Sequence, residues 1–306
     1  MATDEHSTVA ARGTNPQDDT ILAPRRSRIQ KLGLIARQNP LAAVATVILI
    51  TVVAASAAAP IVSPHDPLQH NLGDNFISPG MEYYLGTDNF GRDVLSRLLH
   101  GAQLSLFIAF AATFMGVGAG SVIGIVSGFA GGWLDLIIQR FVDAIMAIPG
   151  LILLLTLVMI MGAGASSVIV ALTIFIIPPS VRIVRGHTMT VSNEAYIDAA
   201  RVIGASYTRI LVRYILPNVF ATIIVAASVV IGAVILAEAA IGFLGLGVTE
   251  PTPTWGNMLS VGAQQHMEQA PWMAITPGVL IVIVVGAFNL LGDGLRDVLD
   301  PRLRGR

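Results

Sequence analysis

Six stretches of this chain are long, apolar and almost free of charged side chains, and they constrain its fold more than any other feature. A helix that crosses a bilayer needs about 20 consecutive apolar residues. Of the 306 residues, 54% are hydrophobic and 12% are charged, whereas a soluble domain carries about 25% charged residues. We therefore expect an all-α, polytopic membrane protein with six transmembrane helices. The predicted helices cover residues 41–59, 104–126, 141–161, 168–183, 219–243 and 275–291.

Two of these stretches allow a more specific expectation. Pro178 and Pro179 lie in the fourth stretch, and proline removes a backbone N–H donor, so we expect that helix to be kinked or unwound at its far end. Residues 55–57 in the first stretch resemble a signal-peptide cleavage site. The polar segment before this stretch is much longer than the charged region of a signal peptide, so we expect a retained helix.

Composition divides the chain into three regions. Residues 1–36 are polar, and we expect a disordered cytoplasmic tail that ends in a short amphipathic helix near residues 29–36. Residues 37–100 would hold the first transmembrane helix and an extracytoplasmic loop. Residues 101–306 would form the core permease domain, with five transmembrane helices and a long inner loop at 182–218.

The distribution of basic residues predicts the orientation in the membrane. If the N-terminus is inside, only Arg92 and Arg97 of the 18 Lys and Arg residues fall in outer segments. Inner segments of membrane proteins carry an excess of Lys and Arg. We therefore expect both termini in the cytoplasm.

The residue types that are missing exclude several kinds of chemistry. The chain has no cysteine, which excludes disulfides, thiol nucleophiles and cysteine-bound zinc, and its net charge of −1 gives no basic field for nucleic acid. A phosphate-binding P-loop contains Gly-Lys-Ser or Gly-Lys-Thr, but the one lysine, Lys31, lies between Gln30 and Leu32. We therefore expect that this chain is not an enzyme, and that energy for transport comes from a partner or an ion gradient.

Glycine recurs at every fourth residue through the second apolar stretch. At this spacing the glycines share one face of a helix, and small residues allow helices in a membrane to approach closely. We expect this face to pack against another helix of the same chain, with a subunit interface or a pore lining as the alternative. The residues are Gly116, Gly120, Gly124, Gly128 and Gly132.

The inner loop at 182–218 has the pattern of two short helices joined at a glycine. Asn193 can cap the first helix, and two acidic residues lie in its first turn, where the helix dipole favours them. Gly204 would end this helix. The second helix would cover residues 207–215 and end at Pro217.

This loop resembles one shared by permease subunits of bacterial ATP-binding-cassette (ABC) importers, whose pattern is Glu-Ala-Ala, three residues, Gly, nine residues, Ile, any residue, Leu-Pro. Here Asp198-Ala199-Ala200 matches the triplet, and Leu216-Pro217 closes the pattern, with Tyr214 in place of Ile. In such permeases the loop is a coupling helix that docks in a groove of a cytoplasmic ATPase. The resemblance implies an ATPase contact through Glu194, Tyr196, Asp198, Ala199, Ala200, Gly204, Ala205 and Arg209.

Three further segments narrow the resemblance to one subfamily. They are 37–41 (Arg-Gln-Asn-Pro-Leu), 86–97 (Gly-Thr-Asp-Asn-Phe-Gly-Arg-Asp-Val-Leu-Ser-Arg) and 242–256, which contains Gly-Phe-Leu-Gly-Leu-Gly and Pro-Thr-Pro-Thr-Trp-Gly. Together they resemble the second, C-type, inner-membrane permease of dipeptide, oligopeptide and nickel importers over residues 37–304.

The resemblance also implies a fold, a location and a set of partners. It implies a type I ABC importer fold in the bacterial inner membrane and a peptide substrate moved by alternating access. The implied partners are a homologous second permease, two ATPase subunits and an extracytoplasmic substrate-binding protein. ATP and magnesium would bind the ATPase subunits, and this chain would hold no cofactor of its own.

Two acidic residues lie within the predicted transmembrane helices, where ionisable side chains are costly and often functional. Glu238 lies near the outer end of the fifth helix and is a candidate for the translocation path, either as a contact for a substrate amine or as part of a gate. Structural pairing is the alternative. Asp143 lies near the inner end of the third helix, where Arg140 could pair with it at i,i+3, and we expect it to have a structural role.

Side chains in the outer loops give weaker candidates. His65 and His70 could ligate a metal such as nickel, but loop histidines are commonly solvated, so we predict no metal site. Trp255 and Trp272 suit an aromatic belt at the outer membrane interface. Residues 251–255 could instead dock the binding protein.

The sequence leaves two kinds of alternative, which are a different class of transporter and a different cargo. An ion-gradient-driven secondary transporter would need charged pairs at midmembrane and internal repeats, and a channel would need a repeated filter segment. The sequence shows neither pattern in its six apolar stretches. Nickel or haem is an alternative cargo for the same type of importer.

Overall fold

Helices provide nearly all the regular structure between residues 39 and 299, which is the part of the chain that the computed structural model describes. The predicted tail at 1–36, with its short helix, lies outside the described residues. An isolated β-bridge joins Thr87 and Asp93. The elements are α2 (Pro40–Ala57), α3 (Ala59–Val62), α4 (Val94–Ala130), α5 (Gly132–Met146), α6 (Gly150–Met161), α7 (Ala165–Ser192), α8 (Ala195–Val202), α9 (Tyr207–Ile210), the π-helical turn η1 (Leu211–Ile215), α10 (Leu216–Phe243), α11 (Trp255–Gln265) and α12 (Trp272–Leu299).

Among the described residues, five helical segments are long and apolar enough to cross a membrane. They are α2, α4, α7, α12 and the segment that runs from α9 through η1 to the end of α10. The pair α5 and α6 passes the same test when taken together, which brings the number of possible crossings to six. The prediction of an all-α, polytopic membrane protein is therefore confirmed.

The third predicted helix, at 141–161, is wrong as a single helix. The structure has two helices there, α5 and α6, which meet at an angle of 87°. Pro149 lies at the break with an extended backbone (ψ 127°). Proline cannot donate an N–H to the preceding turn and disfavours helix in the residue before it. The apolar character of the sequence continues through this break, so hydropathy alone gave one helix.

The fourth predicted helix, at 168–183, is longer than expected and is not unwound. α7 runs for 28 residues from Ala165 to Ser192 with Pro178 and Pro179 inside it. The two prolines remove two backbone N–H donors, but a helix tolerates this where neighbouring helices hold it in place. α4 provides this support, because it packs along α7 more extensively than any other pair of helices in the described chain.

Glycines on α4 allow this close packing. An added Cβ at Gly120 would lie 2.6 Å from the Ser180 Cβ, and one at Gly124 would lie 2.8 Å from the Val181 carbonyl oxygen. Gly116 and Gly128 face α7 in the same way, with contacts of 2.7 Å and 2.9 Å. Gly132 does not share this position, because α4 ends at Ala130 and open space surrounds an added Cβ at Gly132.

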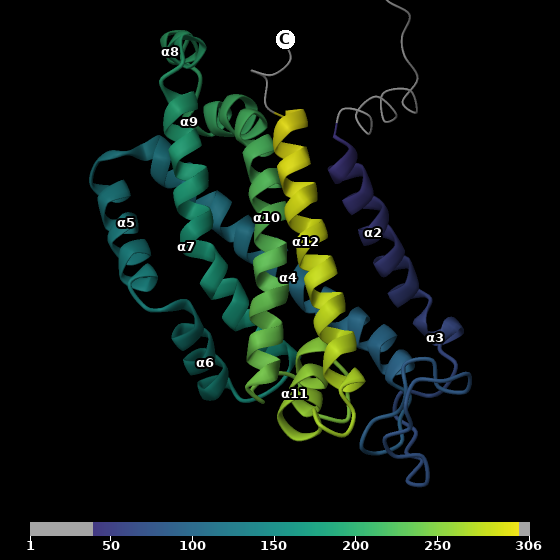
Figure 1. Ribbon diagram of the computed structural model, residues 1–306. Helices are drawn as coiled ribbons and strands as arrows, with labels where there is room; N and C mark the ends of the chain where they lie inside the picture. Colours follow the sequence, from purple (N-terminus) through teal and green to yellow (C-terminus); the bar gives the residue numbers. More distant parts are fainter. Residues whose placement is uncertain (1–38, 300–306) are drawn as a thin grey trace, which may run out of the picture. The chain divides into compact units, whose positions relative to one another are not determined.

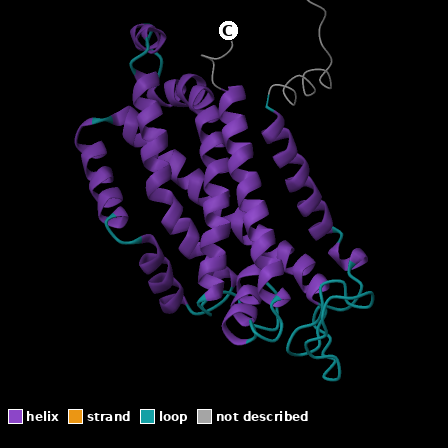
Figure 2. Cartoon of the chain, viewed as in Figure 1, coloured by secondary structure: helices purple, strands orange, loops and turns teal. Residues whose placement is uncertain are grey.

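The long helices run between two opposite ends of the helix bundle, and α8 lies at one of these ends and α11 at the other (Figure 1). The start of α2 and the end of α12 lie at the α8 end, whereas α3 and the loop before α4 lie at the α11 end. Figure 2 shows that most of the loop structure gathers at the α11 end. α2 packs against α12 and α4. The predicted boundary between 37–100 and 101–306 falls inside α4.

Two separate clusters of buried apolar side chains support this arrangement. The larger joins α2, α4, α6, α7, α10, α11 and α12, and it includes Trp255 and Met258. The smaller, which we call the loop cluster, lies at the α8 end. Its buried members are Ile125, Val184, Val191, Ile197, Ala200, Ile210, Ile215 and Val219.

Candidate functional site

The segment between α7 and α10, which we call the α8 loop (residues 193–215), projects from the α8 end (Figure 1). The backbone N–H of Gly204 donates to the Arg201 carbonyl, and that of Ala205 donates to the Ala200 carbonyl, at 3.0 Å each. Gly204 has a φ of +79°, and this combination is the Schellman helix ending, which favours glycine. The prediction that Gly204 ends the first helix is confirmed. The N-cap, however, is Glu194 and not Asn193, and its side chain makes no capping hydrogen bond.

The second half of the loop differs from the prediction of a helix that ends at Pro217. α9 begins after Ser206, whose Oγ accepts from the Arg209 N–H, and it passes through the π-helical turn η1 directly into α10. Pro217 lies in the first turn of α10, where its missing N–H donor is tolerated. The side-chain Nδ2 of Asn218 donates to the Tyr214 carbonyl at 2.6 Å, which gives a carbonyl of the π-helical turn a hydrogen-bond partner.

The inner face of the α8 loop is anchored by apolar side chains. Ile197, Ile210 and Ile215 are each at most 2% exposed and belong to the loop cluster. Of the eight predicted ATPase-contact residues, Ala200 is buried in the same cluster and Ala205 packs partly against it. These two alanines therefore hold the loop on the helices. The exposed members of the predicted set are Glu194, Tyr196, Asp198, Ala199, Gly204 and Arg209.

The outer face of the loop carries large apolar side chains that the sequence analysis did not select. Val202 is 86% exposed, Ile203 is 79% exposed and Tyr207 is 76% exposed. Tyr196, 42% exposed, lies on α8 as well, and partial burial together with the Glu194 carboxylate raises the pKa of its phenol. The sequence signal for this exposed face is the apolar pair Val202-Ile203 just before Gly204. Ile197 and Ala200 already form the buried face of this short helix, so the pair has no place in it.

Two ion pairs join α5 to α7 near the α8 end. The Asp135 carboxylate accepts from Nε and Nη2 of Arg185 at 2.6 Å each, and Asp135 also bonds to Ser127 on α4. Asp143 pairs with Arg182. The candidate partner of Asp143, Arg140, is therefore wrong: α7 runs beside α5 and offers an arginine across the helix interface.

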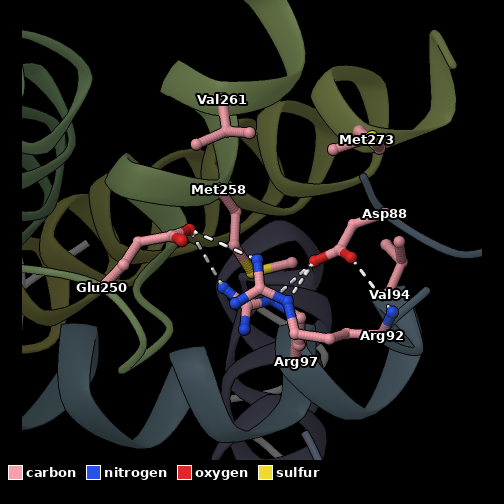
Figure 3. Close-up of a pocket in the computed structure, with 8 residues that line it drawn as sticks. All are labelled: Asp88, Arg92, Val94, Arg97, Glu250, Met258, Val261 and Met273. Carbon is pink, nitrogen blue, oxygen red and sulfur yellow. Dashed lines mark hydrogen bonds and ion pairs between the residues drawn. The ribbon is translucent and has the colours of Figure 1, made fainter. Parts of the chain in front are cut away.

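A second group of charges lies at the α11 end, and we call it the buried charge cluster (Asp88, Arg92, Arg97 and Glu250). Figure 3 shows the four side chains converging. The Arg92 side chain is 2% exposed, and its Nε donates to Asp88 Oδ2 at 2.6 Å. Arg97 is 3% exposed and lies 3.5 Å from the same Asp88 oxygen. Both arginines reach Glu250 Oε1 at 3.5 Å. The two arginines that were assigned to outer segments therefore have buried, paired side chains.

The buried charge cluster connects segments that are far apart in the sequence. Arg97 Nη1 donates to the carbonyls of Pro67 at 3.2 Å and Pro251 at 3.4 Å. A cavity of about 20 Å³ lies beside the four charged side chains, and Met258 and Met273 contribute to the apolar part of its lining. The arrangement fixes the loop before α4 and the segment after α10 to the first turn of α4.

Glu238 lies inside the protein. It is 2% exposed, and the hydroxyls of Ser105 and Thr254 lie within hydrogen-bonding reach, while Oε2 has no partner among the described residues. The Trp255 backbone N–H donates to Ser105 Oγ at 3.1 Å, so Glu238 lies where α4, α10 and α11 meet. In this conformation the buried position of Glu238 fits a structural role, as a hydrogen-bonded group between helices, better than a direct contact with substrate.

The tryptophans and histidines selected from the sequence lie in different surroundings in the structure. Trp255 is completely buried, so its predicted place in an interfacial belt is wrong; the indole Nε1 donates to the Leu98 carbonyl at 3.3 Å. Trp272 is partly exposed and donates to the Thr87 carbonyl at 3.1 Å. His65 stacks on Tyr83 and His70 packs on Phe90, so each imidazole has its own aromatic partner.

Comparison with known proteins gives one consistent family. Residues 120–305 match the family described as binding-protein-dependent transport system inner membrane component. Residues 35–79 match the N-terminal transmembrane domain of oligopeptide transport permease C. The crossing helices, the α8 loop and these matches define an inner-membrane permease subunit of an ABC importer.

Relatives of the same length support this class. The dipeptide transport system permease protein DppC of Alkalihalophilus pseudofirmus is 37% identical over 290 residues, which cover 94% of each chain. The glutathione transport system permease protein GsiD of Escherichia coli O6:K15:H31 is 40% identical over 270 residues, covering 88% of this chain and 89% of GsiD. The chain therefore belongs to the family of binding-protein-dependent transport system inner membrane components, and the predicted resemblance to C-type permeases is confirmed.

A solved structure agrees on the fold. A chain of the MetNI methionine ABC transporter, in an inward-facing conformation, superposes with a TM-score of 0.57 and 22% identity. The match covers 67% of this chain and 96% of that chain. The predicted permease fold is confirmed by this likeness.

Proposed function

We propose that this chain forms half of the translocation path of an ATP-driven importer of short peptides, and that a separate ATPase acts on it through the α8 loop. The names of the two relatives, which refer to a dipeptide and to glutathione, support a peptide cargo. One structural observation carries the coupling role: Val202 and Ile203 are exposed on a loop whose own apolar core is already complete.

The outer face of the α8 loop has the composition of a protein interface. Contiguous exposed apolar side chains are unfavourable in water and mark contact surfaces, and interfaces combine such a centre with a polar rim. Val202, Ile203 and Tyr207 supply the apolar centre. Glu194 and Arg209 are exposed charged residues that supply the rim.

The energy for transport comes from partners in this proposal. A P-loop needs a lysine after a glycine, and Lys31 between Gln30 and Leu32 cannot provide it. Two ATPase subunits would therefore bind ATP and magnesium at the α8 end, which faces the cytoplasm according to the excess of Arg and Lys in the segments assigned to that side. A homologous second permease completes the path, and a binding protein delivers the peptide at the α11 end.

Transport then proceeds by alternating access. ATP-dependent closure of the ATPases moves the α8 loops of the two permeases, and the helices rock to open the path to one side or the other. The ATPases can shift this equilibrium only if they contact the α8 loop differently in the two states. Peptide selection belongs mainly to the binding protein, so this chain needs no deep peptide site.

A co-purification experiment tests this proposal. The tagged full-length chain is expressed with its second permease and ATPase subunits, and the double variant V202E/I203E is compared with the wild type. We expect the variant to recover about tenfold less ATPase, because binding would bury two unpaired carboxylates in the apolar centre of the interface. The matched control is M81E, which places a charge on a side chain that is 97% exposed at the α11 end. Equal ATPase recovery from both variants would contradict the proposal.

The buried carboxylate of Glu238 favours one other function, transport driven by an ion gradient, because ionisable groups inside membrane proteins often relay ions. Proteoliposomes that contain only the two permeases, with a proton or sodium gradient and no ATPase, test it. Uptake under these conditions would support the secondary transporter and exclude the ATP-driven importer. We expect no uptake without the ATPase subunits.

A further inference from the structure

Phe129, in the last turn of α4, contacts the exposed part of the α8 loop. The Tyr207 ring packs edge-on against the Phe129 ring, with centroids 5.7 Å apart and planes at 72°. The guanidinium of Arg201 lies over the same ring, 5.7 Å from its centroid, and Arg201 also donates to Asp198 at 3.1 Å. One α4 side chain thus touches both halves of the loop, before and after Gly204.

The same turn of α4 is also fixed to α5 and α7. Ser127 bonds to Asp135 at the start of α5, and Asp135 holds Arg185 of α7 through two bonds of 2.6 Å. An added Cβ at Gly128 would lie 2.9 Å from the Arg185 carbonyl oxygen. Three successive residues therefore connect this turn to α5, to α7 and to the α8 loop. The next element is the bent pair of α5 and α6.

We propose that Phe129 is a positioning residue that passes movement of the α8 loop to the last turn of α4, and from there through Asp135 to the bent α5–α6 pair. This inference rests on the coupling role proposed for the α8 loop. Phe129 lies partly exposed at the edge of the loop cluster, whereas Ile125, one turn earlier, lies within it. The loop cluster holds the loop in place, and Phe129 links the side chains nearest the partner surface to α4.

The contact is suited to this task because it depends on geometry. An aromatic pair and a cation–π contact are each favourable only over a narrow range of ring positions. A loop that shifts relative to α4 therefore either loses both contacts or moves α4 with it. Coupling between two sites requires such an element whose arrangement both sites influence.

The test uses the complete importer in proteoliposomes, with peptide uptake and ATP hydrolysis measured on the same preparation. In F129A we expect ATPase subunits to co-purify as in the wild type, while peptide moved per ATP hydrolysed falls about fivefold, in line with the loss of two aromatic contacts. F129W keeps a ring and restores the ratio. F129L keeps apolar bulk without a ring and gives an intermediate ratio. The control is F220A, a comparable truncation of a side chain on α10 that is 55% exposed.

The outcomes separate this inference from the proposed function. A wild-type ratio in F129A or in F129L, with the complex assembled, overturns the role of Phe129 and leaves the coupling role of the α8 loop intact. If F129A does not assemble, F129L and F129W decide by the same criterion. If the wild-type chain recruits no ATPase at all, the proposed function itself fails.

Discussion

The buried charge cluster and the α8 loop lie at opposite ends of the helices, and they differ in which side chains are exposed to solvent. In the buried charge cluster, Arg92 and Arg97 are at most 3% exposed and share the carboxylates of Asp88 and Glu250. In the α8 loop, Arg201 and Asp198 pair at the surface with 47% and 65% exposure, while Val202 and Ile203 face solvent.

One region is completed by its own chain, whereas the other leaves an apolar face exposed, which is what the proposed contact with an ATPase requires. Burying the charges of Arg92, Arg97 and Asp88 is costly unless each finds an opposite charge and hydrogen bonds, and the α11 end provides both, with the partly exposed Glu250 as the second carboxylate. The α8 loop pays no such cost, because its charges stay in water and only its apolar outer face is left uncovered. Stability should therefore depend on the first region and partner binding on the second.

The largest effect is expected from removing one buried charge. R92M removes the 2.6 Å partner of the Asp88 carboxylate, whose side chain is 6% exposed, and leaves it only Arg97 at 3.5 Å. Removing one partner of a buried ion pair costs about 3–5 kcal/mol and Arg97 offsets only part of this, so we expect a large drop in the thermal unfolding temperature of the purified chain. R201M makes the same change in the α8 loop and should cost less than about 1 kcal/mol. Similar losses in both variants would show that the two regions do not differ as described.

A second test concerns what fixes α4 and α7 near the α8 end, where charge is not buried to the same degree. G124A places a Cβ 2.8 Å from the Val181 carbonyl oxygen and should cost about 1–3 kcal/mol through forced separation of the helices. G118A, on the same helix, meets nothing within 4 Å and should be neutral or slightly stabilising. Thermal unfolding of the two single variants compares them directly. A loss in G118A as large as in G124A would refute close packing as the cause.

The comparison also explains which features could be predicted from sequence. The apolar stretches revealed the membrane helices because length and lack of charge are local properties. Gly204 revealed the end of α8 for the same reason, since its φ of +79° is a property of one residue. The break at Pro149 was missed because apolar side chains continue through it, and the extension of α7 was missed because a helix can leave the apolar region and continue.

Contacts between distant segments were beyond sequence reasoning. Arg97 and Glu250 are 153 positions apart, and no local pattern shows that they meet. The pairing of Asp143 with Arg182 depends on α7 lying beside α5, so the nearer Arg140 was the wrong choice. The exposure of Val202 and Ile203 depends on which side of α8 the loop cluster occupies, and that face is decided by tertiary packing.

A smaller effect should distinguish the two kinds of ion pair by salt. D198N removes a surface pair with Arg201 at i,i+3 and should cost less than about 0.5 kcal/mol at low salt. At 1 M salt the Debye length falls to about 3 Å, so this cost should vanish. D88N removes a buried partner of Arg92 and should keep its larger cost at both salt concentrations, because buried pairs are screened much less. Equal salt dependence of the two variants would mean that solvent reaches both sites.

The smallest effect on stability is expected from the apolar side chains that most distinguish the α8 loop. V202S/I203S truncates two side chains that are 86% and 79% exposed. The free energy of unfolding of the isolated chain should therefore change by no more than about 0.5 kcal/mol. The matched control V191S/I197S changes the same residue types at positions 6% and 0% exposed, and it should be strongly destabilising. If V202S/I203S destabilises the chain as much as the control, the outer face of the loop belongs to the core of this protein, and the distinction between a completed end and a partner-binding end fails.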